Sequence, residues 1–267
     1  MRRTLSDGPG PDKARTWRVA ATLAVAVLAA AAAPRSARAI GDASLFDVRG
    51  VDYAGGSATP RPSAPRRLAW EVRKRTSVAT QLTPTRARLD DPSIFETPFL
   101  YWSGDRAFAA MSGAEVAGLR RFVELGGFVL VDDAAPDASG FDASIRRELG
   151  RAFPTSPLQT LPPSHTVFRS FYLVDRPVGR VEGSPLIEGI ERGGRLALAY
   201  SRHDLGGALA RDNLGTWEHS VVPGGDEQRE QAIRFAVNVV LYALCLDYKD
   251  DQVHAPFILR RRGGGVP

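Results

Sequence analysis

A strand, a helix and a second strand follow one another within residues 99–133, and this unit constrains the fold more than any other part of the sequence. Residues 99–102 and 128–131 are short, wholly apolar runs, which are typical of strands buried on both faces of a sheet. Between them, Ser112 and Glu115 have the spacing of a capping box, and Gly126 can end the helix in a left-handed conformation. The segment therefore predicts a βαβ unit with two parallel strands and a right-handed crossover.

Strand and helix patterns alternate along the rest of the chain. Because the composition does not change between them, they predict one α/β domain, a three-layer sandwich of flavodoxin-like type with a mostly parallel sheet and helices on both faces. The last helix is apolar nearly all round in its second half, so we expect that half, with the single cysteine Cys245, to be buried. The further predicted strands cover residues 45–51, 78–89 and 195–200, and the further predicted helices cover residues 68–75, 141–153 and 227–246.

The N-terminal segment has the pattern of a secretory signal peptide. Basic residues precede the uncharged apolar run 19–33, and Ala37-Arg38-Ala39 has the small-x-small pattern that signal peptidase recognises. The apolar run is shorter than the roughly 20 residues that span a bilayer as a helix. We expect residues 1–39 to be removed after Ala39, which leaves a periplasmic or secreted domain over 40–250 and a tail over 251–267. The alternative is an uncleaved anchor formed by residues 19–33.

Without this segment the protein is formally neutral. Removing its seven Lys and Arg and its two Asp leaves 28 residues of each charge. Nucleic-acid binding needs a concentrated basic face, so no nucleic-acid partner is expected. No membrane span is expected after cleavage either, because Arg234 and Asn238 interrupt the last helix. One cysteine excludes an intrachain disulfide and a metal cluster built from cysteines.

Polar residues follow three of the predicted strands. Ligands of open parallel sheets bind beyond the carboxyl ends of the strands, so these residues form the candidate site. The proline-rich segment that carries His165 is expected to reach the same edge. The candidate ligand-binding residues are Gly104, Asp132, Asp133, His165, Ser201, Arg202, His203 and Asp204, and the candidate catalytic residues are Ser103 and His203.

Two catalytic alternatives remain open from these residues. A serine, an aspartate and a histidine occur in the chain order of an α/β-hydrolase triad, but the G-x-S-x-G elbow is absent. They are Ser103, then Asp132 or Asp133, then His165 or His203. Asp132, His165 and His203 are also suitable ligand types for a divalent metal ion, although no close spacing supports such a site. Because no recognised catalytic spacing is present, the leading hypothesis is a non-catalytic domain. It would bind an envelope protein or a small ligand at this edge, and no cofactor is expected.

Six stretches of the sequence carry a resemblance to a known family: residues 75–77, 98–101, 126–133, 161–168, 200–205 and 238–242. Together they resemble an exported bacterial domain family of unknown function. Its fold is similar to that of class I glutamine amidotransferases, and its members are often large membrane-anchored proteins encoded near MoxR-type ATPases and von Willebrand factor A proteins. Amidotransferases use a cysteine at a strand-to-helix elbow, whereas the only cysteine here is Cys245 in the last predicted helix, so that activity is not expected.

Overall fold

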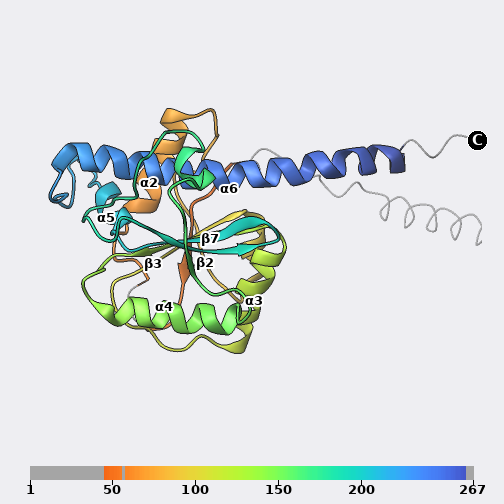
Figure 1. Ribbon diagram of the computed structural model, residues 1–267, viewed down its shortest axis with the longest axis horizontal. Coiled ribbons are helices and arrows are strands. Elements are labelled where there is room, and N and C mark those ends of the chain that lie inside the picture. The colour runs from red at the N-terminus through yellow and green to blue at the C-terminus, as the bar shows by residue number, and fades with distance from the viewer. Residues whose placement is uncertain (1–44, 56–57, 263–267) are drawn as a thin grey trace, which may run out of the picture. The chain divides into compact units, whose positions relative to one another are not determined.

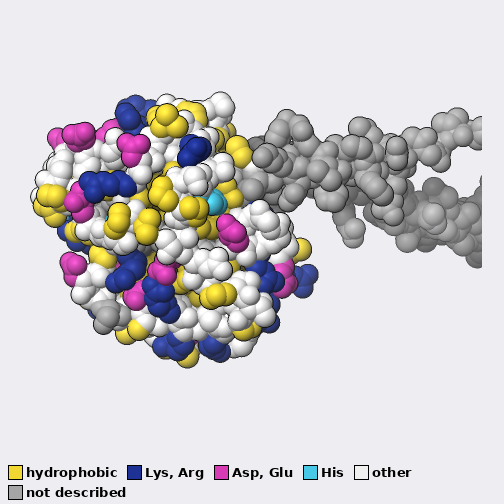
Figure 2. All heavy atoms as spheres, in the orientation of Figure 1, with side chains coloured by type: hydrophobic (Ala, Val, Ile, Leu, Met, Phe, Trp, Pro, Cys, Tyr) yellow, Lys and Arg dark blue, Asp and Glu magenta, His cyan; other side chains and the backbone are white. Residues whose placement is uncertain are grey.

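The computed structural model describes residues 45–55 and 58–262 (Figure 1). The predicted signal peptide, residues 1–39, lies outside the described residues. On the face drawn in Figure 2, positively and negatively charged side chains are interspersed over the described part of the chain.

A seven-stranded sheet with the order β2-β1-β3-β4-β7-β6-β5 forms the centre of the fold. Its first five strands in this order are parallel, and the last two pair antiparallel. In chain order, the five parallel strands have the arrangement 2-1-3-4-5, which is the flavodoxin-like order. The predicted mostly parallel sheet is therefore confirmed. The strands are β1 (Arg49–Asp52), β2 (Arg86–Arg88), β3 (Phe99–Gly104), β4 (Phe128–Asp133), β5 (Gln159–Thr160), β6 (Glu188–Arg192) and β7 (Arg195–Ser201).

Helices cover both faces of this sheet (Figure 1). Each face has its own hydrophobic core, one around Leu68 and Phe235 and the other around Leu119 and Ile145. The three-layer sandwich is confirmed. On one face lie α2 (Ala64–Arg75), α5 (Leu205–Leu209), α6 (Gly225–Arg262) and the short 3-10 helix η2 (Thr166–Arg169), and on the other lie α3 (Gly113–Glu124), α4 (Ser139–Ala152) and the 3-10 helix η1 (Pro92–Glu96).

The predicted strand–helix–strand unit is β3, α3 and β4. The Glu115 amide donates to Ser112 Oγ at 3.1 Å, and the Ser112 amide donates to Glu115 Oε2 at 2.8 Å, so the capping box is present. Gly126 has φ +106°, the left-handed region that glycine adopts without steric cost. β3 and β4 are parallel and in register from Phe99 opposite Phe128 onward.

The antiparallel pair β5 and β6 was not predicted. β6 and β7 form a hairpin whose turn is Gly193-Gly194, and both glycines have positive φ, +60° and +77°. A two-residue Gly-Gly turn is a recognised hairpin signal, so this hairpin was detectable in the sequence. The predicted strand 78–89 is reduced to β2 and an isolated bridge at Thr80, since Pro84 lies between them.

The last helix differs from the prediction in its end and in the burial of its cysteine. α6 continues past the expected end at residue 246 to Arg262 and includes Pro256. Residues 247–255 contain no glycine or proline, so no local signal ends the helix near residue 246. Cys245 is exposed rather than buried. The helix passes the amino end of β7 at Tyr242, whose hydroxyl accepts from the Leu196 amide at 3.0 Å, and Cys245 lies beyond that point. Within the described residues, no helix combines the length and apolar composition that a membrane crossing requires.

Candidate functional site

The carboxyl ends of β3, β4 and β7 lie side by side, as predicted. Ser103 is opposite Asp132, and Asp132 is opposite Ser201. Because β4 lies between the other two strands, its two terminal aspartates are at the middle of this edge. The structure thus brings together all of the predicted strand-end residues.

Asp132 is fully buried, and its carboxylate accepts hydrogen bonds from backbone amides at the start of α5. Its Oδ1 accepts from the Leu205 amide at 2.8 Å, while its Oδ2 accepts from the Gly206 amide and from the Tyr101 hydroxyl, both at 2.7 Å. Burial raises the pKa of Asp132, and the nearby Asp204 carboxylate raises it further, while the three hydrogen bonds oppose the shift. With three hydrogen bonds and no exposed surface, this carboxylate is not accessible to a ligand.

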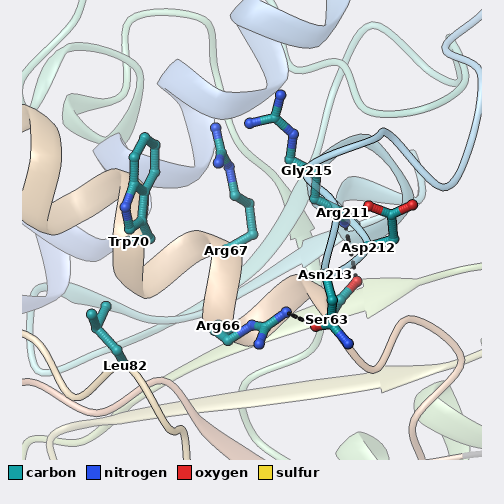
Figure 3. Close-up of a pocket in the computed structure, with 9 residues that line it drawn as sticks. All are labelled: Ser63, Arg66, Arg67, Trp70, Leu82, Arg211, Asp212, Asn213 and Gly215. Atoms are coloured by element: carbon teal, nitrogen blue, oxygen red, sulfur yellow. Dashed lines mark hydrogen bonds between the residues drawn. The ribbon is translucent and has the colours of Figure 1, made fainter.

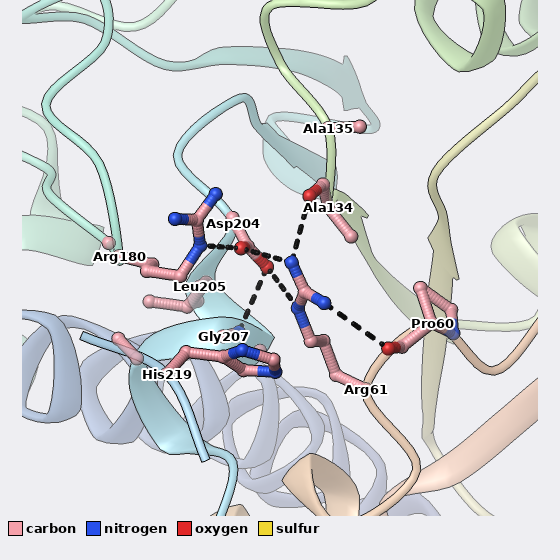
Figure 4. A network of polar contacts seen from close by, with 12 residues as sticks. Pro60, Arg61, Ala134, Ala135, Arg180, Asp204, Leu205, Gly207 and His219 are labelled. Carbon is pink, nitrogen blue, oxygen red and sulfur yellow. Dashed lines mark hydrogen bonds and ion pairs between the residues drawn. The ribbon is translucent and has the colours of Figure 1, made fainter. Parts of the chain in front are cut away.

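Asp204 is the centre of a buried ion-pair network (Figure 4). Arg61 donates to both of its oxygens, through Nε at 3.0 Å and Nη2 at 2.7 Å, and Arg180 Nε donates to Oδ2. Asp204 also accepts from the Gly207 amide at 2.9 Å and is the one non-glycine residue of the described chain with positive φ, at +50°. Through these contacts Asp204 connects the loop that carries Arg61, the loop that carries Arg180 and the first turn of α5.

The two arginines of this network were not among the predicted site residues. Arg61 is 143 positions from Asp204, and Arg180 is 24 positions from it. No spacing pattern connects residues at such separations, and with 35 Lys and Arg in the chain no single arginine stands out. The two arginines reach Asp204 because the loop before α2, the loop before β6 and the loop after β7 come together at this edge.

His203 is held between two internal partners. Its Nε2 lies 2.6 Å from the Ser184 carbonyl oxygen, and its Nδ1 lies 3.2 Å from Ser201 Oγ. A carbonyl can only accept, so we assign the proton to Nε2 and infer that Nδ1 accepts from the serine hydroxyl. Burial lowers the pKa of His203, which favours this neutral ring. Both nitrogens are occupied, and neither is free to act as a base.

Ser103 and Gly104 lie where a flavodoxin-like sheet opens a crevice, between the ends of β1 and β3. Here the crevice is filled. The Tyr53 hydroxyl donates to the Ser103 carbonyl at 2.9 Å, and a Cβ on Gly104 would lie 2.2 Å from the Phe141 ring and 2.3 Å from the Tyr53 hydroxyl. The buried Ser103 hydroxyl has no hydrogen-bond partner, so it contacts neither a histidine nor a carboxylate in the way that a triad requires.

His165 is not at this edge, which corrects the expectation drawn from the proline-rich segment. Its Nδ1 accepts from the Val167 amide at 3.1 Å, and its ring centroid lies 5.6 Å from that of Tyr242, beside the amino end of β7. The prolines direct the segment along the opposite end of the sheet. The metal set with Asp132 and His203 therefore does not assemble, and the described residues contain no group of three His, Cys, Asp or Glu placed to hold a metal ion.

Asp133 and Arg202 each have one unsatisfied buried atom. Asp133 Oδ1 accepts from the Ala135 amide at 3.0 Å, but its Oδ2 has no hydrogen-bond partner. Arg202 Nε has none either, although it lies 3.9 Å from Asp133 Oδ2 and 3.7 Å from Asp142 Oδ1. Arg202 also lines a pocket of about 270 Å³ together with Tyr200, Pro136 and Ser184. This is the part of the edge where polar groups are still available.

Asp133→Asn is expected to raise the free energy of unfolding at pH 8 by about 1 to 2 kcal/mol. Burial raises the pKa of Asp133 to about 6, above its ordinary value of 3.8. The folded state therefore holds the proton more tightly than the unfolded state, and the wild type loses stability as the pH rises from about 4 to about 6. Asparagine never ionises and escapes this loss. Urea unfolding between pH 4 and pH 8 measures the difference.

The increase in the free energy of unfolding that Asp133→Asn produces should fall toward zero at pH 4. Asp137→Asn removes an exposed carboxylate from the same loop and should change the stability by less than about 0.5 kcal/mol at either pH. A gain of equal size at both pH values would contradict the assigned cause.

Comparison with protein families identifies a match to a described domain family. The family model described as "Domain of unknown function (DUF4159)" matches residues 48–244, which include β1 to β7 and the whole carboxyl edge. No curated protein matches the chain.

Proposed function

The chain belongs to the DUF4159 family of domains of unknown function, and on that premise we propose that it is a non-catalytic binding domain. Its ligand is a small polar molecule, or a polar side chain of an envelope partner, that enters the pocket beside Arg202 at the carboxyl edge of the sheet. The ligand carries a group that both donates and accepts hydrogen bonds, such as a hydroxyl or a carboxamide.

The unsatisfied pair of Asp133 Oδ2 and Arg202 Nε carries this proposal. A buried acceptor and a buried donor without partners cost free energy, and such pairs in folded proteins call for an explanation. Their separation of 3.9 Å is too long for a hydrogen bond and short enough for one hydroxyl or amide group to contact both. Arg202 is partly exposed and also belongs to the pocket wall, so its side chain connects the pocket with Asp133.

The remaining polar groups of the edge favour binding over catalysis. Asp132, Asp204 and His203 make internal hydrogen bonds that hold the loops in place, so their polar atoms are not available to a substrate. General acid–base chemistry needs a titratable group within hydrogen-bond reach of a substrate. A rigid edge with one open pocket instead resembles a preformed ligand site.

Export, as the N-terminal pattern predicts, is part of the proposal, because it would place the pocket in the cell envelope or outside the cell. N-terminal sequencing of the protein recovered from the envelope and the medium tests it. A start at Ile40 supports export with cleavage, whereas Met1 would support the anchored alternative.

The binding proposal is tested by calorimetric titration of the full chain with N-acetylglucosamine and with N-acetylglycinamide, which supply hydroxyl and amide groups. We expect saturable binding of at least one of them, weakened about 10-fold in Arg202→Gln, because a hydrogen bond to a charged group contributes about 1.5 kcal/mol. Arg106→Gln is the matched control, since Arg106 is an exposed arginine near the same edge that lines none of the described pockets. Equal affinities of the wild type and Arg202→Gln would contradict the proposal.

A further inference from the structure

Three arginines surround Trp217 on the face of the sheet that α2 and α6 cover. The guanidinium carbons of Arg229, Arg211 and Arg67 lie 4.2, 4.4 and 5.2 Å from the centroid of its ring. Arg67 also lies 4.1 Å above the ring of Trp70. The Nε atom of each of the three arginines is buried and has no hydrogen-bond partner. Aromatic rings stabilise cations, but they do not satisfy N–H donors.

The carboxylates nearby do not balance these charges. Arg67 pairs with Glu71, which Arg75 shares, and Arg229 donates only to backbone carbonyls. Among the hydrogen bonds and ion pairs of the described residues, Arg211 contributes only its backbone amide, which donates to Ser63 Oγ at 3.1 Å, and its buried Nε has no partner. Burial lowers the pKa of Arg67 and of Arg229, and in both cases the charge of Arg211 lowers it further. The cluster thus has excess positive charge, and its three Nε donors have no acceptor.

The cluster opens into a pocket of about 310 Å³ between α2 and the loop 211–215 (Figure 3). Three arginines and one carboxylate line its polar side, and Trp70 and Leu82 supply an apolar wall. The carboxylate, Asp212, accepts from the backbone amides of its own loop at 2.9 and 2.7 Å, so the arginines Arg66, Arg67 and Arg211 outnumber it in the lining. This volume is at the lower end of the range for small-molecule sites, and it exceeds what a bare inorganic anion needs.

We propose that this pocket binds a small organic oxyanion, a carboxylate or a phosphate monoester. The anionic group contacts the guanidinium of Arg211, whose planar fork suits a bidentate contact with two oxygens. The apolar body of the ligand packs against Trp70 and Leu82. A bound anion supplies the missing acceptor and relieves the repulsion among the three arginines. This site is separate from the Arg202 pocket and does not depend on the function proposed there.

The test is calorimetric titration of the full chain with phenyl phosphate, benzoate, inorganic phosphate and uncharged benzyl alcohol. We expect phenyl phosphate or benzoate to bind with a Kd below about 1 mM and benzyl alcohol not to bind at up to about 10 mM. Arg211→Gln should weaken that binding about 10-fold or more, because it removes a charge-assisted contact. Arg121→Gln should leave it unchanged, since Arg121 is exposed on α3, on the other face of the sheet.

The anions also separate the two sources of an oxyanion. Preference for phenyl phosphate identifies a phosphate monoester, preference for benzoate identifies a carboxylic acid, and both support the site. Arg211→Lys keeps the charge without the fork and should give an intermediate affinity, so it tests the site even where glutamine impairs folding. Absence of saturable binding, equal binding of benzyl alcohol, or unchanged affinity in Arg211→Gln and Arg211→Lys would each overturn the proposal.

Discussion

Asp204→Ala is expected to lower the free energy of unfolding by about 3 kcal/mol, because it leaves Arg61 and Arg180 without their shared carboxylate. Asp204 is fully buried, whereas the two arginine side chains are 18 and 27 % exposed and regain some hydration. Alanine also tolerates a positive φ less well than aspartate, which adds to the loss. Urea denaturation of the full chain at pH 7 measures the change.

Two further variants separate the causes of this loss. Asp105→Ala breaks another aspartate–arginine pair near the same edge, but Arg106 is 65 % exposed, so the loss should stay below about 1 kcal/mol. Asp204→Asn keeps one acceptor oxygen and a residue that tolerates the left-handed region, and its loss should lie between the other two. Similar losses for Asp105→Ala and Asp204→Ala would mean that burial of the network contributes little.

Gly104→Ala is expected to lower the free energy of unfolding by about 3 kcal/mol through overpacking. The added Cβ would lie 2.2 Å from a carbon of the Phe141 ring and 2.3 Å from the Tyr53 hydroxyl, so both rings must move. Both are buried in a core that also contains Phe108, which limits where they can go. Thermal and urea unfolding measure the loss.

Gly150→Ala is the matched control for overpacking. Gly150 lies within α4, and a Cβ there meets nothing within 4 Å. Alanine in a helix interior is favoured over glycine by about 1 kcal/mol, so this variant should be more stable than the wild type. A neutral Gly104→Ala would show that the crevice between β1 and β3 can open, and would return that position to the candidate ligand sites.

The sequence predicted which residues lie together at the strand ends of the candidate site, but it did not predict how the surrounding loops are arranged. Apolar runs marked where β3, β4 and β7 end, so the proximity of Asp132, Asp133 and Ser201 followed from parallel pairing alone. His165 was misplaced because a segment with several prolines has no periodicity that gives its direction. His203 and Asp204 were assigned to ligand binding, with a role in fixing a loop as the alternative, and sequence could not decide between the two because residue type does not reveal which groups are already satisfied.

The sequence by itself determined the strand–helix–strand core, the capping box and the mostly parallel sheet. Hydrophobic periodicity and helix capping are interactions between residues a few positions apart, so a single sequence displays them. Tertiary structure alone decided that Arg61 and Arg180 meet at Asp204 and that Tyr53 and Phe141 fill the crevice over Gly104. It also decided that Arg211 has no carboxylate partner among the described residues. These contacts join segments far apart in the chain, and they depend on where the loops close and which polar atoms are used first.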